Sequence, residues 1–160
     1  MSKFLLDYPS FVPRPNEPII SEFNRLAVHN QWQKGADEWK KNRRLYIGAA
    51  VREEFALAFG VDQDSLEGWK KICVAVGVIS AAEVDSLKSV SDCEKKLEGT
   101  FVNLVDLTDS LRRGDEVMSR QGVHKSRKAL SSYIQATSKY FSLQEAKKLP
   151  FLARFLIKVG

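Results

Sequence analysis

"DEWKKNRRLYIGAAVREEFALAFG", residues 37–60, repeats apolar residues at helical spacing and contains no proline. Trp39 and Tyr46 are seven positions apart, so a helix places them on the same face. Gly60 is a natural helix terminator, because glycine readily adopts the backbone conformation that ends a helix. The segment therefore predicts one long helix over residues 37–59.

The basic run KKNRR, Lys40–Arg44, lies inside this predicted helix and has two interpretations. Cations beside Trp39 and Tyr46 would suit phosphate contacts combined with base stacking. The same two aromatic residues also fit a stripe of core positions, with the basic side chains covering apolar surface by their alkyl stems. We favour the core interpretation.

Helical spacing extends over most of the chain, and no run alternates with a period of two for long enough to predict a sheet. We therefore predict an all-α protein, a single compact domain of six to eight short helices. Pro150 should kink or split the last helix. The predicted helices cover residues 18–32, 37–59, 64–77, 80–99, 100–114 and 125–138, and a final segment from 142.

Three pairs with the spacing of a capping box predict where helices begin. The residues between the predicted fifth and sixth helices, 112–124, form the longest expected loop and the best candidate for a mobile segment. The capping pairs are Asp64 with Glu67, Ser80 with Glu83, and Ser142 with Glu145.

The segment DYPSFVPRPNEPI, residues 7–19, holds four of the five prolines. Its P-x-x-P spacing would suit display to a polyproline-reading domain. Tyr8 and Phe11 are interleaved with the prolines, and a freely exposed tail rarely carries such residues together. We therefore expect residues 1–18 to form an extended proline-rich strap packed on the domain, and residues 19–160 to form one helical folding unit.

The formal net charge of +5 is unevenly distributed along the chain. Residues 1–111 carry a net charge of −3, whereas the C-terminal third from residue 112 carries +8. Such asymmetry can attract nucleic acid, an anionic membrane surface or the acidic face of another protein. Solvated helix faces would explain it equally well. The predicted anion-binding or partner-binding residues are Arg112, Arg113, Arg120, Lys125, Arg127 and Lys128.

The motifs of the sequence predict no catalytic, cofactor-binding or metal-binding residue. The two histidines and two cysteines are scattered, without the paired short spacings of zinc sites. Nucleotide-binding glycine loops and nucleophile elbows are absent from the sequence. Asn103, Asp106 and Asp109 would form a polar stripe on one helix. That stripe could hold a metal or a substrate, or it could hydrogen-bond a neighbouring loop or pair with arginine.

Several features predict an intracellular protein of the cytoplasm or nucleus. No apolar run approaches the ~18 residues of a membrane span. The N-terminus, MSKFLLDYPS, lacks the pattern of a signal peptide. Cys73 and Cys93 are too few for a disulfide framework and suggest a reducing compartment.

The N-terminal stretch FLLDYPSFVPRPNEPIISEFNRLAVHNQW, residues 4–32, resembles a family of small uncharacterised fungal proteins. Their pattern runs F-x-x-Y-P-x-F, then P-x-x-P, then E-F-x-R-L and a tryptophan, with a later V-N-L-V-D-L segment. SLEGWKKICVAVGV at 65–78 and FVNLVDLTDS at 101–110 agree with it in order. The resemblance implies a fungal, intracellular setting for a chain matched over nearly its whole length. It implies no activity, cofactor or catalytic residue.

Three hypotheses for function follow, in order of preference. The first is a non-catalytic intracellular protein-interaction module that could self-associate. The second is a nucleic-acid- or chromatin-associated protein that uses the basic C-terminal third. The third is an enzyme with a polar site around Asn103, Asp106 and Asp109.

Overall fold

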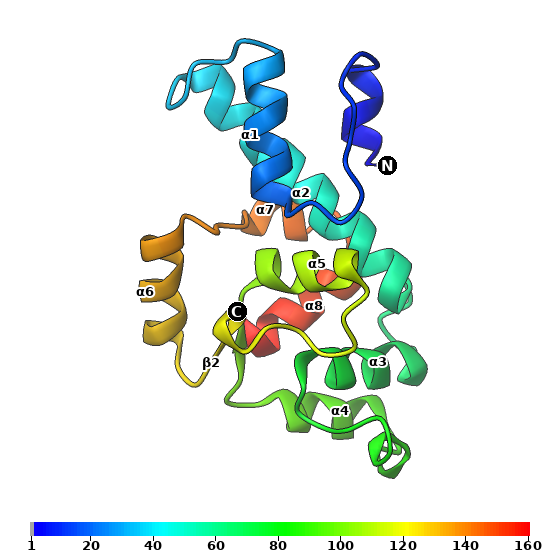
Figure 1. Cartoon of the computed structure of the whole chain (residues 1–160). Coiled ribbons are helices and arrows are strands. Elements are labelled where there is room, and N and C mark those ends of the chain that lie inside the picture. Colours follow the sequence, from blue (N-terminus) through cyan, green and yellow to red (C-terminus); the bar gives the residue numbers. More distant parts are fainter. Residues whose placement is uncertain (1) are drawn as a thin grey trace.

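The computed structural model describes residues 2–160, and the predicted all-α class is confirmed (Figure 1). Its α-helices are α1 (Ile19–His29), α2 (Asp37–Phe59), α3 (Leu66–Val76), α4 (Val90–Leu97), α5 (Leu104–Arg113), α6 (Arg127–Thr137), α7 (Leu143–Ala146) and α8 (Pro150–Val159). Three short 3-10 helices are η1 (Lys3–Asp7), η2 (Val84–Ser86) and η3 (Arg120–Gly122). Strands β1 (Phe101–Val102) and β2 (Val123–His124) form an antiparallel pair.

Helix α2 is the element around which the others pack. It contacts η1, α1, α3, α5 and α7 (Figure 1). Its residues Tyr46, Ile47, Val51 and Phe55 are buried in the hydrophobic core. The helix has the bounds expected from the sequence, and Gly60 ends it with a positive φ of 85°.

Helix α8 brings a second set of aromatic residues onto α2 and α3. The ring of Phe151 lies 5.2 Å from Phe55 and 5.2 Å from Trp69, measured between centroids. The Trp69 indole N–H donates to the Gln63 carbonyl at 2.7 Å, so its polar atom is satisfied while its ring is buried. Pro150 stands at the first turn of α8, where its missing N–H costs nothing, so the proline splits the last helical segment as expected.

The N-terminal segment lies on the outside of α1 and α2. Leu5 and Phe11 are buried, and Tyr8 packs edge-on against Trp32 with centroids 5.5 Å apart. Residues 3–7 form η1 and are not extended, because the Ser2 hydroxyl accepts a hydrogen bond from the Phe4 N–H and starts a turn. The chain after η1 runs without helix to α1.

The single helix expected over residues 80–99 is wrong, because a stronger capping signal lies further along the chain. The Ser89 hydroxyl accepts from the Asp92 N–H at 3.1 Å, and the Asp92 carboxylate accepts from the Lys88 N–H at 3.0 Å. These reciprocal bonds start α4 and leave only the short η2 before it.

Two other predicted helix starts also differ from the structure. Ser65, and not Asp64, caps α3, since its hydroxyl accepts from the Gly68 N–H at 3.1 Å. Ser142 makes no side-chain cap at α7. The capping box fails there because the carboxylate of Glu145 binds Arg52 instead.

The connection between α5 and β2 is anchored to the core at several points. Met118 is buried, and its N–H donates to the Ala75 carbonyl at 2.8 Å. The chain then enters strand β2, where Val123 pairs with Val102 of β1. Across residues 2–160, every helix is too short or too polar to span a bilayer.

Candidate anion-binding groove

The first three basic residues of the predicted partner-binding set are occupied within the protein. Arg112 pairs with Glu22 at 3.1 Å, and Arg113 pairs with Asp115 at 2.8 Å. Arg120 donates to the carbonyls of Val76 and Met118. Arg112 therefore joins α5 to α1, Arg113 makes a local pair, and Arg120 ties the α5–β2 connection to α3.

The other three members of that set lie together at the start of α6. Lys125, Arg127 and Lys128 are exposed, and the guanidinium of Arg127 lies 5.9 Å from the centroid of the Phe101 ring. Throughout residues 2–160, no carboxylate comes within 4.0 Å of the three charged groups. Their role in binding stays a prediction.

The predicted polar stripe on α5 serves to join distant segments. Asn103 caps α5 through Oδ1 and donates from Nδ2 to the Lys139 carbonyl at 2.9 Å. Asp106 accepts from Lys139 Nζ at 2.7 Å and from the Tyr133 hydroxyl at 2.6 Å. Asp109 accepts from the Ile19 N–H at 2.9 Å, and burial raises the pKa of its carboxyl group. All three side chains thus have structural partners.

The histidines and cysteines also lie apart. Cys73 and Cys93 are unbridged and buried, and burial raises the pKa of the Cys73 thiol to about 12. His29 hydrogen-bonds the Ser10 hydroxyl at 2.9 Å, whereas His124 packs on the ring of Tyr133. In the described part of the chain, no three His, Cys, Asp or Glu side chains gather into a metal-binding group.

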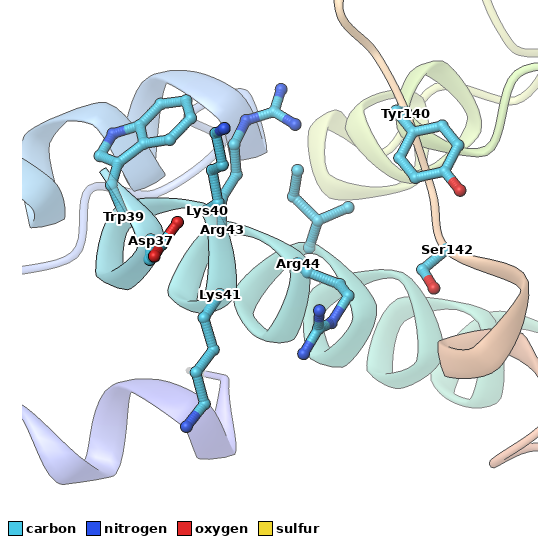
Figure 2. A pocket seen from close by; sticks show the side chains of 9 residues that line it. Asp37, Trp39, Lys40, Lys41, Arg43, Arg44, Tyr140 and Ser142 are labelled. Carbon is cyan, nitrogen blue, oxygen red and sulfur yellow. The ribbon is translucent and has the colours of Figure 1, made fainter. Parts of the chain in front are cut away.

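A groove runs along the first half of α2, opposite the segment that joins α6 to α7 (Figure 2). Its volume is about 500 Å³, within the range of small-ligand sites. We call it the α2 groove. It is lined by Asp37, Trp39, Lys40, Lys41, Arg43, Arg44, Ile47, Tyr140 and Ser142.

Arg43 is the most unusual charge in the α2 groove. Its guanidinium is half-buried and donates to the Ser138 carbonyl at 2.6 Å. No carboxylate of residues 2–160 lies within 4.0 Å of it. Burial, with no nearby acid to offset it, lowers the pKa of Arg43. Partial burial of a charge without an opposite charge is unfavourable, so this cation is incompletely neutralised.

Other half-buried cations of the protein have the acid that Arg43 lacks. Arg52 reaches Glu145 at 2.9 Å, and Arg154 reaches Glu94 at 2.9 Å. Half-buried arginines in this chain are therefore normally paired with carboxylates. Further pairs of this kind are Arg25–Glu17, Lys70–Asp85, Arg112–Glu22 and Lys139–Asp106.

The wall of the α2 groove opposite α2 is held by the polar stripe of α5. Ser138 ends α6 with a positive φ of 59° and directs the chain toward α2. Lys139 then turns inward to Asp106, as described above. The next residue, Tyr140, is 58% exposed and lies at the edge of the groove, on the segment across from α2 (Figure 2).

The two aromatic residues beside the KKNRR run have different roles. Tyr46 is fully buried and donates its hydroxyl hydrogen to Glu22, as the core interpretation requires. Trp39 is half-buried, with one edge against Phe23 and the guanidinium of Arg43 5.8 Å from its ring centroid. Trp39 therefore lines the groove as well as the core.

From the sequence, the core interpretation was favoured over phosphate binding for the cations of this groove, and its opposite wall was not identified. Tyr140 and Ser142 follow Arg43 by nearly a hundred residues, and no local pattern relates them to α2. The signal for the groove was the mixture of Trp39 with four cations in one short run, and it was set aside because Trp39 and Tyr46 share a helical face.

No protein-family model, curated protein or solved structure matches this chain. The resemblance to small fungal proteins therefore stays a prediction.

Proposed function

We propose that the protein is a non-catalytic interaction module that binds an anionic partner through the α2 groove. The observation that carries this proposal is the half-buried guanidinium of Arg43, which has a carbonyl partner and no acid. A bound anion would supply the charge that carboxylates supply to the other half-buried arginines. Charge-assisted bonds to phosphate or carboxylate are the strongest hydrogen bonds that arginine makes.

The non-catalytic part of this proposal is supported by the structural roles of the side chains that could take part in catalysis. Asp106 and Asp109 are committed to Lys139, Tyr133 and a backbone N–H. The buried Cys73 thiol, with its raised pKa, is a poor nucleophile at neutral pH. The groove itself offers permanent cations and aromatic rings, which suit binding better than proton transfer. Two unbridged cysteines also favour the intracellular setting that forms part of this proposal.

The exposed patch at the start of α6 is the competing surface. Lys125, Arg127 and Lys128 are fully solvated there, and solvated cations gain little from a single anion because water and salt screen them. Arg43 is already partly desolvated, so an anion bound beside it interacts in a medium of lower effective dielectric constant.

The test is an NMR titration of the 15N-labelled protein with inorganic pyrophosphate at low ionic strength. We expect the Arg43 side-chain Nε–Hε signal and the backbone amides of residues 39–44 to shift together and to saturate. Arg43→Gln should abolish the saturating shifts, because the neutral side chain cannot pair with the anion. The matched control is the triple variant Lys125→Gln, Arg127→Gln, Lys128→Gln, which should shift like the natural protein.

Shifts confined to residues 125–128, or no saturating shift at all, would overturn the proposal. Equal shifts in the natural protein and Arg43→Gln would do the same, since the groove would then not depend on its distinctive charge.

A further inference from the structure

We propose that the anionic partner of the α2 groove is a single strand of nucleic acid, with phosphates on the cations of α2 and a base on Tyr140. This inference rests on the proposed function and specifies its ligand. It differs from the basic-third hypothesis, because the binding surface lies on α2 and not on residues 112–128.

The arrangement of the cations favours a chain of charges over one isolated anion. Lys40 and Arg43 project to one side of α2, whereas Lys41 and the guanidinium of Arg44 lie on the other side (Figure 2). One phosphate cannot reach all four groups. Successive phosphates along a strand can, and the unpaired state of Arg44, Lys40 and Lys41 leaves them available.

Tyr140 supplies the flat apolar surface that a base requires. Its ring is more than half exposed at the mouth of a cationic groove, where an acidic peptide would gain nothing specific from it. Base-on-aromatic stacking accepts any base, and the combination of stacking platforms with backbone-tracking cations is typical of single-strand binding. The backbone before Tyr140 is also held in place, since Lys139 is bonded through both its Nζ and its carbonyl.

The size of the α2 groove favours a single strand of nucleic acid over a duplex as its ligand. A volume of about 500 Å³ admits part of one strand. A duplex would have to enter as a body whose major groove alone is about 12 Å wide. Its bases are also stacked on each other and present no free face to Tyr140.

The experiment measures fluorescence anisotropy of a labelled eight-nucleotide deoxythymidine strand. Competitors are an eight-base-pair duplex, an octaglutamate peptide and vesicles with anionic lipid. We expect the single strand to bind at least tenfold more tightly than any of these. The logarithm of its affinity should fall with the logarithm of salt concentration by about 0.7 for each phosphate contact.

Substitutions separate the contribution of the cations to binding affinity from the contribution of base stacking. Tyr140→Ala should weaken binding of the strand by about tenfold or more, through the loss of one stacked base, and should leave the salt slope unchanged. Tyr140→Phe keeps the ring and should bind like the natural protein. The double variant Arg43→Gln, Arg44→Gln should flatten the salt slope by about 1.4, which corresponds to two phosphate contacts. The triple variant at residues 125, 127 and 128 is the control for general charge loss.

Failure of this inference can be distinguished from failure of the proposed function. The nucleic-acid inference is wrong if pyrophosphate shifts the Arg43 signal while the single strand binds no better than octaglutamate. It is also wrong if the Tyr140→Ala variant binds the single strand as tightly as the natural protein does. In both cases the anion-binding proposal stands. Stronger binding to vesicles would likewise overturn the inference in favour of a membrane surface. If pyrophosphate leaves Arg43 unaffected, both fall together.

Discussion

The two halves of α2 carry arginines in opposite environments. Arg52 in the second half donates to the carboxylate and carbonyl of Glu145, and its helix face is packed beneath α7. Arg43 in the first half is similarly half-buried but donates only to a carbonyl, beside an open groove. One continuous helix therefore has a closed half in which Arg52 is paired with a carboxylate and an open half in which Arg43 is not.

The difference shows that counting charges along a sequence does not locate a binding surface. The C-terminal third has the largest basic surplus, yet Arg112, Arg113 and Arg120 already have partners within the chain. The first half of α2 lies in a part of the chain with a net negative charge, yet its cations have few partners. Pairing in three dimensions decides which charges remain free for a ligand.

The largest effect on stability is expected from a variant in which a paired arginine loses its carboxylate and so becomes unpaired, like Arg43. Glu22→Gln removes the negative charge opposite Arg112 while keeping the shape of the side chain and a carbonyl oxygen that can still accept from the Tyr46 hydroxyl. We expect the free energy of unfolding in urea to fall by about 3–5 kcal/mol, because a buried charge loses its partner.

The control for this variant replaces the pair as a whole. Glu22→Leu with Arg112→Met should recover part of the loss, since an apolar pair leaves no uncompensated charge. A loss below about 1 kcal/mol in Glu22→Gln would contradict the argument, because burial of an unmatched guanidinium would then be tolerated everywhere in the fold.

The second prediction concerns the closed half of α2. Gly48 lies directly beneath α7, and a Cβ there would stand 2.5 Å from Glu145 Oε1 and 2.8 Å from its Cβ. Gly48→Ala should lower stability in urea by about 1–3 kcal/mol through overpacking, although alanine favours helix. A gain near 1 kcal/mol, the helix-propensity effect alone, would show that α7 can move away from α2.

A fall in pH should destabilise the contacts of the closed half of α2 more than those of the open half. Burial alone would raise the pKa of Glu145, but hydrogen bonds from Lys148 and Arg52 outweigh it and lower the pKa. The folded protein therefore favours the ionised carboxylate. Its stabilisation is complete above the unfolded pKa of about 4.3 and is lost as the pH falls through the lower folded value.

Urea midpoints at pH 6, 4.5 and 3 measure this effect in the natural protein and in Glu145→Gln. We expect the natural protein to lose about 1 kcal/mol more than the variant over this range. Parallel pH profiles for the two proteins would exclude Glu145 as a source of the acid sensitivity.

The smallest effect on stability should come from Arg43 itself. Arg43→Gln removes one hydrogen bond to a carbonyl and also removes a poorly compensated charge, so the two changes nearly cancel. We expect the free energy of unfolding to change by less than about 0.5 kcal/mol. A loss of 2 kcal/mol or more would mean that Arg43 serves the fold, as Arg52 does, and would weaken its assignment to ligand binding.

Local patterns were sufficient for much of the fold. The bounds of α2 follow from uninterrupted helical spacing and from Gly60, both of which are local properties. The boundary of α4 did not follow, because Ser80 and Ser89 offer the same type of cap and only the reciprocal bond of Asp92 with Lys88 decides between them. The predicted capping pair does not form at α7, because the Glu145 carboxylate accepts a hydrogen bond from Arg52, 93 positions away in the sequence.

The candidate site was less accessible to sequence reasoning for the same physical reason. Trp39 and Tyr46 share a helical face, and the period alone cannot show that one ring is buried and the other borders a groove. The polar stripe of α5 was recognised as a cluster, yet its partner Lys139 came from a different helix connection. Features that depend on two distant segments require the tertiary structure.

The packing of α8 has a consequence for how this chain is made. Phe55 and Trp69 leave the ribosome long before Phe151, the residue that covers both of them. A nascent chain that contains α2 and α3 but not α8 leaves two large aromatic side chains without this cover for about 4–16 s, at a synthesis rate of ~5–20 residues per second. During that interval the unfinished domain is a substrate for chaperones, and stalled or truncated products lacking α8 are expected to aggregate.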